Sequence, residues 1–299
     1  MPDHSKHQGS DLPGTEVITL SDPERRELVT RKVTCPFLGP AVATGRLPVR
    51  QDARRPLASI EDVRRLGNSG GGDLGEVLMI FAQGNHAFMP GPTGAFDQPV
   101  PLGFFSLDLP GSQGSHPGHS GILQADPNVV DSGRFSAADF DRLRSHARDG
   151  LVKRSDVGTF IKENVERDPD ATKLSIRESL KGVISTLVEA VPAGLELLTN
   201  AIAGNREGAE QRELLEALTR NARASNLIGS AGEFGLLFAF LEHKPGSVSV
   251  DGEPTLAIED LERMFEEKRF PPGWETWPKT KSSWVRNTLA LAHSAAGIT

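Results

Sequence analysis

The chain from residue 155 onward repeats apolar residues at the spacing of an α-helix. The segments that follow a period near 3.6 residues are 155–167, 175–190, 195–203, 207–224, 225–243, 257–268 and 283–296. Alternation typical of a strand occurs only at 247–250. Helices of this kind are stable when they bury their apolar faces against one another. The sequence therefore predicts a mainly α fold, organised as a single compact helical domain.

Composition and charge restrict the classes of function. The 299 residues are 37% hydrophobic and carry a net charge of −7. A nucleic-acid-binding protein would show a basic stripe, so no nucleic-acid partner is expected. The single cysteine excludes an intramolecular disulfide, and the fold does not need an oxidising compartment. No apolar stretch reaches the roughly 18 residues of a membrane span. We expect a soluble, cytoplasmic protein with no membrane partner.

The organisation along the chain follows from turn and capping signals. Residues 1–30 predict an N-terminal arm with a short helix at 23–29, and residues 31–299 predict the domain. Ser59 and Ser136 precede helical segments and are expected to cap them. Residues 90–121 are rich in proline and glycine, which predicts a long irregular loop of the kind that can act as a lid.

The only cysteine, Cys35, stands directly before a proline. Pro36 suits the first position of a helix, which makes Cys35 the N-cap and turns its sulfur toward the amides of Phe37 and Leu38. The positive end of a helix stabilises a thiolate, so a lowered pKa and good ligand properties are expected. Gly45 and Pro48 predict the end of this helix. The competing interpretation is a small buried hydrophobic residue.

Glu233 lies in the middle of an apolar helical segment, 230–240. A buried carboxylate has a raised pKa, which suits a general acid–base near neutral pH. Gly232 and Gly235 flank it and are expected to leave room for a flat ligand. The competing interpretation places Glu233 on a solvent-facing stripe of an amphipathic helix.

Four sequence blocks, in order, resemble the haem-thiolate peroxidases, the family of fungal chloroperoxidase and the unspecific peroxygenases. The blocks are 35–38 (Cys-Pro-Phe-Leu) with 45–48 (Gly-Arg-Leu-Pro), Asp126 with 135–140, 232–239 (Gly-Glu-Phe-Gly-Leu-Leu-Phe-Ala), and 261–265 running into 270–274. With the stretches between them they span residues from about 34 to 290. The first block is similar to the axial-cysteine motif of the family, and the third to the helix that bears its distal glutamate.

This resemblance implies a chloroperoxidase-like helical domain that encloses haem b. Cys35 would be the axial thiolate, with Pro36, Phe37 and Leu38 around the cofactor, and Glu233 the distal acid–base. The implied reaction is the oxidation or oxygenation of a small, apolar or aromatic substrate, or of halide, by hydrogen peroxide. The phenylalanines expected to line an apolar pocket, or else the plain core, are Phe96, Phe104, Phe105, Phe234 and Phe238. The sequence leaves open whether the protein forms a homodimer.

The chain also departs from the family pattern. Where members carry Glu-His-Asp or Glu-Gly-Asp, this sequence has Gln124, Ala125 and Asp126, which weakens the divalent-cation (Mg²⁺ or Ca²⁺) site that the resemblance implies. Ala125 cannot assist Glu233 as the histidine of some members does. The candidates to take the place of that histidine are His86, His116 and His119. In other members an arginine about two turns before the glutamate has this role. Here Asn226 stands seven residues before Glu233, and Arg223 three residues further back, so no charge partner is assured.

Three other functions remain open from the sequence. One is a haem-binding protein without peroxide chemistry, which the departures favour. Another is a haem-free helical interaction module in which Cys35 and Glu233 are structural. The third is a thiolate-haem enzyme that rearranges or dehydrates its substrate without peroxide.

Overall fold

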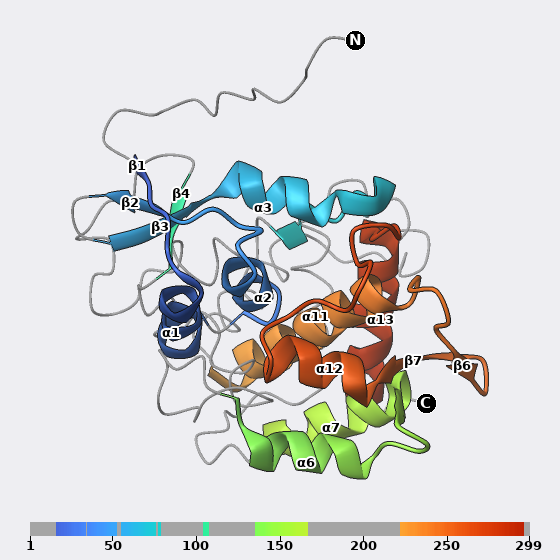
Figure 1. Cartoon of the computed structure of the whole chain (residues 1–299). Coiled ribbons are helices and arrows are strands. Elements are labelled where there is room, and N and C mark those ends of the chain that lie inside the picture. Colours follow the sequence, from blue (N-terminus) through green and yellow to red (C-terminus); the bar gives the residue numbers. More distant parts are fainter. Residues whose placement is uncertain are drawn as a thin grey trace, which may run out of the picture.

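A computed structural model describes residues 16–33, 35–52, 55–75, 77–78, 104–107, 135–166 and 222–295. More than half of these residues are helical, as the periodicity predicts, and two small sheets accompany the helices. The helices are α1 (Asp22–Lys32), α2 (Leu38–Ala43), α3 (Ile60–Gly67), α6 (Ala137–Ser145), α7 (Arg154–Glu166), α11 (Ala222–Leu241), α12 (Ile258–Phe265) and α13 (Lys281–Ala295), with a 3₁₀ turn at Ser69–Gly71. Figure 1 shows α11 passing through the middle of this arrangement.

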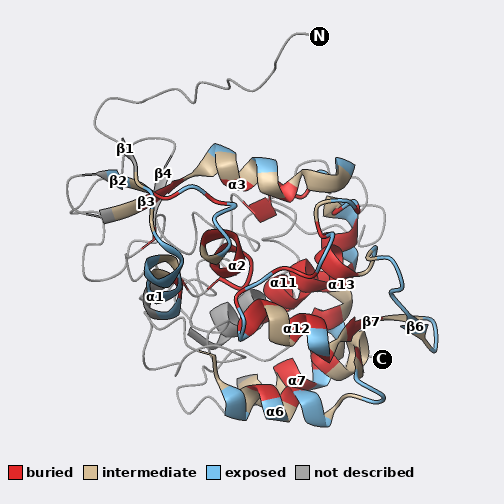
Figure 2. Ribbon diagram, in the orientation of Figure 1, coloured by how far each residue is buried: buried red, intermediate tan, exposed pale blue. Residues whose placement is uncertain are grey.

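The core forms around α11. Residues 230–241 of this helix are all buried, because its sequence is apolar on every side and must be covered by other elements. Helix α13 packs against it most extensively, and α7 lies against both. In Figure 2 the buried surface concentrates on α2, α11 and α13, while α1 and α6 present exposed faces.

Two antiparallel sheets were not expected from the sequence. The first has the order β1 (Glu16–Val17), β2 (Arg50–Asp52), β3 (Arg55–Ser59) and β4 (Phe104–Ser106), and the second has the order β5 (Leu151–Lys153), β7 (Glu253–Ala257) and β6 (Ser249–Val250). Only β6 overlaps the one predicted strand, 247–250, so the expectation of a single strand was wrong. Strand β4 lies inside the predicted irregular loop 90–121, most of which is outside the described residues.

Asp-Gly pairs form two of the tight turns in this chain. Asp149 and Gly150 have φ of 52° and 75°, and Asp251 and Gly252 have φ of 54° and 79°. Positive φ at both central residues is the geometry that matches the twist of a two-residue hairpin, and Asp-Gly favours it. The second turn joins β6 to β7, in register Val250 to Glu253. These dipeptides are the signal that could have predicted the hairpins.

The predicted helix ends are confirmed. The Ser59 hydroxyl accepts a hydrogen bond from the Asp62 amide at 3.4 Å, and Ser136 caps α6 in the same way. At the end of α2, Gly45 has φ of 70° and the Arg46 amide bonds the Ala41 carbonyl at 2.9 Å. This is the Schellman arrangement that a glycine permits.

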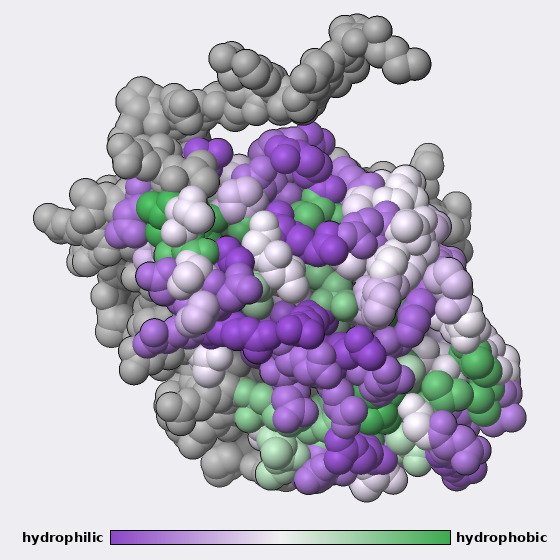
Figure 3. Space-filling model, viewed as in Figure 1, coloured by the Kyte–Doolittle hydropathy of each residue, from purple (hydrophilic) through white to green (hydrophobic). Residues whose placement is uncertain are grey.

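The N-terminal helix belongs to the packed structure. The helix expected at 23–29 is α1, which crosses the boundary expected at residue 30 and packs against α2. Its Val29 side chain is fully buried. No helix in the described part of the chain is long and apolar enough to cross a membrane. The face seen in Figure 3 is largely hydrophilic, with hydrophobic surface near the β6–β7 hairpin.

Candidate functional site

Cys35 lies in the turn that leads into α2. The regular helix begins at Leu38 with Phe37 as its N-cap, so the expectation that Cys35 is the N-cap was wrong. The reason is Pro40, which has no N–H to donate to the carbonyl four residues before it. The Cys35 carbonyl nevertheless accepts a hydrogen bond from the Gly39 amide at 2.9 Å. Cys35 therefore starts a helical turn that Pro40 interrupts.

The sulfur of Cys35 has the amide partners that the sequence predicts, but its pKa differs from the prediction. The backbone amides of Leu38 and Phe37 donate hydrogen bonds to it, and both lower its pKa. Burial and the charge of Glu233 outweigh them and raise the pKa of the Cys35 thiol to about 12. The expected lowered pKa was therefore wrong for the protein by itself. A bound metal cation would reverse this balance, because a coordinating thiol loses its proton.

Glu233 is buried, with 5% of the residue exposed. The interpretation that placed it on a solvent-facing stripe was wrong. Burial raises the pKa of its carboxyl well above the ordinary value of 4.5. The cause of this shift is desolvation, because a charged carboxylate is disfavoured away from water. Glu233 thus has the environment expected of an acid–base group.

The face of α11 that carries Glu233 is turned toward the Cys35 segment. Phe240 lies seven residues after Glu233, which is two helical turns and about 10 Å along the same face. The Phe240 ring stacks on Phe37 with centroids 4.8 Å apart. The effect of the Glu233 charge on the pKa of Cys35 gives a second, independent sign that the two groups are close. Cys35 and Glu233, separated by almost 200 positions, thus share one buried region.

An aromatic cluster borders this region. Phe37 contacts Phe270 at 5.3 Å and Trp274 at 6.0 Å between ring centroids, and Phe270 stacks on Trp274 at 4.0 Å. Arg46 lies over the Trp274 ring at 5.5 Å. The fourth block of the resemblance, 270–274, therefore packs beside the first. Phe234 and Phe238 are core residues.

Lys268 is a component of the site that the sequence did not predict. Its side chain is buried, and its Cδ lies 3.6 Å from the position a Cβ would occupy on Gly39. Burial lowers the pKa of Lys268 to about 8, while its charge opposes the raised pKa of Cys35. No local signal distinguishes it, since the charged run around it is typical of an exposed surface.

Gly235 does not make room for a ligand beside Glu233, so the expectation was wrong for this glycine. A Cβ on Gly235 would lie 2.1 Å from the Thr288 hydroxyl of α13. The Gly232 carbonyl accepts a hydrogen bond from the Trp284 indole at 3.1 Å. Both glycines are therefore contacted by α13.

Replacing Gly235 by alanine is expected to destabilise the protein by about 1–3 kcal/mol, because the added methyl overpacks the α11–α13 contact. Thr288→Ala removes the clashing hydroxyl, which has no hydrogen-bond partner among the described residues. The double variant Gly235→Ala/Thr288→Ala should recover most of the loss in urea unfolding. Additive effects of the two substitutions would contradict this packing.

Several predicted residues lie outside the described part of the chain. They are Phe96, Gln124, Ala125 and Asp126 and the histidines His86, His116 and His119. Phe104 and Phe105 belong to β4, and Arg223 and Asn226 to the first turns of α11. Within the described ranges, no three His, Cys, Asp or Glu side chains come together as a metal site would require. The expected cation site at Gln124 and Asp126 thus remains a prediction.

Comparison with known proteins gives no family. No family model, no curated protein and no solved structure matches this chain. The function is therefore argued from the Cys35–Glu233 region itself.

Proposed function

We propose that this chain is a haem-thiolate protein of chloroperoxidase-like type that uses hydrogen peroxide to oxidise or oxygenate a small organic substrate. The observation that carries the proposal is the pairing of Cys35 and Glu233 in one buried region. Cys35 is the only thiol of the chain, and two amides already bond its sulfur. The cytoplasm is the proposed location, since nothing in the fold needs a disulfide.

The residues around Cys35 fit a haem in their chemistry. Amide donors to the sulfur stabilise a thiolate ligand, and the aromatic cluster of Phe37, Phe240 and Phe270 offers apolar surface. When bound, thiolate-ligated haem supplies the redox chemistry, because the thiolate favours cleavage of the peroxide O–O bond. The protein supplies the ligand, the acid–base and the exclusion of water.

Glu233 is the proposed acid–base. Its carboxylate would accept a proton from hydrogen peroxide and return it to the departing oxygen, which leaves as water. The raised pKa of Glu233 means that the carboxyl holds a proton more strongly than an exposed glutamate does, which favours its role as proton carrier. Lys268, on the Cys35 side, would offset the negative charge of the thiolate.

The experiment is the absorption spectrum of the full chain, purified with haem supplied, reduced and saturated with carbon monoxide. A strongly red-shifted Soret band is expected from the wild type. Cys35→Ala should lose this band, and Cys35→His should give haem without the shift. Glu233→Gln is the matched control, because it should keep the band. A band retained in Cys35→Ala, or haem without the shift in the wild type, would refute Cys35 as the ligand.

A second candidate is a haem-free helical protein in which Cys35 and Glu233 are core residues. The observation that favours it is the pKa of the Cys35 thiol, raised to about 12 as in an ordinary buried cysteine. It predicts a colourless protein after haem reconstitution, so the same spectrum separates the two functions.

A further inference from the structure

A cavity of about 350 Å³ lies at the C-terminal end of α11. The start of α7, α13 and the β6–β7 hairpin line it, and β5, which leads into α7, pairs with β7 of the hairpin. Its lining residues are Arg154, Glu242, His243, Ser247, Val248, Ser249, Gly252, Pro254, Thr255 and Arg286. The volume is at the lower end of the range for small-molecule sites.

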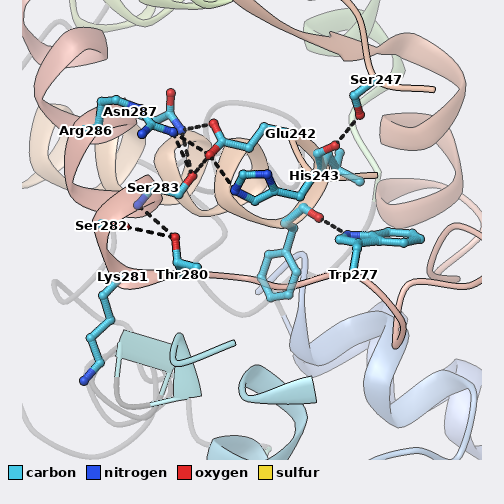
Figure 4. Close-up of polar contacts among 12 residues, drawn as sticks. Glu242, His243, Ser247, Trp277, Thr280, Lys281, Ser282, Ser283, Arg286 and Asn287 are labelled. Atoms are coloured by element: carbon cyan, nitrogen blue, oxygen red, sulfur yellow. Dashed lines mark hydrogen bonds and ion pairs between the residues drawn. The ribbon is translucent and has the colours of Figure 1, made fainter. Parts of the chain in front are cut away.

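The carboxylate in this cavity, Glu242, forms an ion pair with Arg286. Arg286 donates to its Oε1 at 2.6 Å, and Asn287 donates to its Oε2 at 2.8 Å. The Ser283 hydroxyl also bonds Oε1, and His243 Nε2 lies 3.3 Å from it. Figure 4 shows these side chains converging on Glu242. Glu242 therefore balances Arg286 and leaves little negative charge for a second cation.

Arg154 is that second cation. Its Nη1 donates to the side-chain Oδ1 of Asn287 at 3.0 Å. Across the described ranges no carboxylate lies within ion-pair distance of it, although the charges of Glu253 and Glu242 reach it from farther away. Burial and the neighbouring Arg286 lower the pKa of Arg154. An arginine stays protonated all the same, so its positive charge lines the cavity without a direct counter-ion.

The cavity also has an apolar side. Val248 and Pro254 line it, and Val248 is 48% exposed, which is unusual for a large hydrophobic residue in the described part of the chain. The Thr255 and Ser247 hydroxyls direct their protons to the Val248 and Leu241 carbonyls. These two hydroxyls are then unable to donate to an anion, whereas the two guanidinium groups are the charged donors that the cavity offers it.

We infer that this cavity binds an organic carboxylate, with the carboxylate on Arg154 and Arg286 and an apolar body against Val248 and Pro254. A planar guanidinium binds carboxylate through two parallel hydrogen bonds, and an anion here relieves the repulsion between two arginines. The site lies beyond the C-terminal end of α11, whereas Glu233 lies in the middle of that helix. It is therefore a second site that does not depend on the proposed haem chemistry.

Calorimetric titration of the full chain with benzoate, acetate and inorganic phosphate, at constant ionic strength, tests this inference. Benzoate is expected to bind with one-to-one stoichiometry and more tightly than acetate or phosphate. Arg154→Gln should weaken benzoate binding by about tenfold or more, the effect of losing a charge-assisted pair. Arg148→Gln is the matched control: the same change at an exposed arginine a few residues earlier should leave the affinity unchanged.

Val248 gives a second test that leaves the polar network intact. Its side chain is exposed, so polar variants should fold. Val248→Ser should weaken benzoate binding by removing the apolar contact, and Val248→Asp should weaken it further because its negative charge repels the carboxylate. The inference is overturned if the wild type binds no benzoate, or if Arg154→Gln and both Val248 variants bind it as the wild type does. Tighter binding of phosphate, or equal binding of acetate, would overturn the assignment of an apolar carboxylate.

Discussion

Glu233→Gln is expected to slow peroxide-dependent turnover of the haem-loaded protein by about 10²–10⁴-fold, the usual loss when a general acid–base is removed. Glutamine keeps the size of the side chain but cannot accept the proton of hydrogen peroxide. In the wild type the rate should rise with pH as the Glu233 carboxyl ionises, and the variant should lack this limb. Stopped-flow mixing with peroxide measures both. Glu266→Gln, at an exposed glutamate, is the control that should behave as wild type.

The same variant has an effect on stability that requires no haem. Because the pKa of Glu233 is higher in the folded chain than the ordinary value of 4.5, folding favours its protonated form. This contribution is fully present below about pH 4.5 and is lost as the pH rises through the folded-state pKa. Relative to Glu233→Gln, the wild type should lose up to about 1.4 kcal/mol per pH unit in this window. Parallel urea-unfolding profiles of the two proteins would contradict the burial of Glu233.

Lys279→Met is expected to destabilise the protein by about 2–6 kcal/mol, because two buried carbonyls lose their donor. Lys279 is fully buried. Its ammonium donates to the Trp277 carbonyl at 2.9 Å, to the Trp274 carbonyl and to the Ser69 hydroxyl at 3.1 Å. It also lies 4.9 Å from the centroid of the Trp274 ring. The side chain thus ties the turn before α13 to the glycine-rich loop after α3.

Urea unfolding at pH 7 measures this loss, since burial lowers the pKa of Lys279 only to about 8 and leaves it mostly charged there. Lys281→Met is the matched control, two residues along in a partly exposed position. Similar small effects of the two substitutions would show that the Lys279 hydrogen bonds are not what holds this turn.

The ends of the helices are determined by residues close together in the sequence. Ser59 and Ser136 cap their helices by bonding an amide three residues on, and Gly45 ends α2 because a glycine takes positive φ at little cost. The amide bonds to the Cys35 sulfur also span only two and three residues. Burial of Glu233 was one of two interpretations that the helix by itself left open, and the tertiary structure decided between them.

The strands were missed because their stability comes from pairing. Strands β2, β3 and β7 are short, and they contain charged residues or proline without an alternating pattern. Their partners come from distant parts of the chain, as in the register of Leu57 with Ser106. The two Asp-Gly turns are the exception, because both of their positive φ values are a local property.

The amino-acid sequence by itself determined the described helices from residue 154 onward, the Ser59 and Ser136 caps, and the two residues, Cys35 and Glu233, around which a function can be proposed. The helices predicted at 175–190, 195–203 and most of 207–224 lie outside the described residues. Tertiary structure alone decided the acidity of Cys35, which burial and the Glu233 charge raise. It also decided that Gly235 faces Thr288 and that Arg154 lines a cavity. The physical reason is the distance along the sequence between the groups that interact. A cap or a turn depends on hydrogen bonds within a few residues. Burial, charge and cavities instead depend on side chains that meet only after the chain has folded.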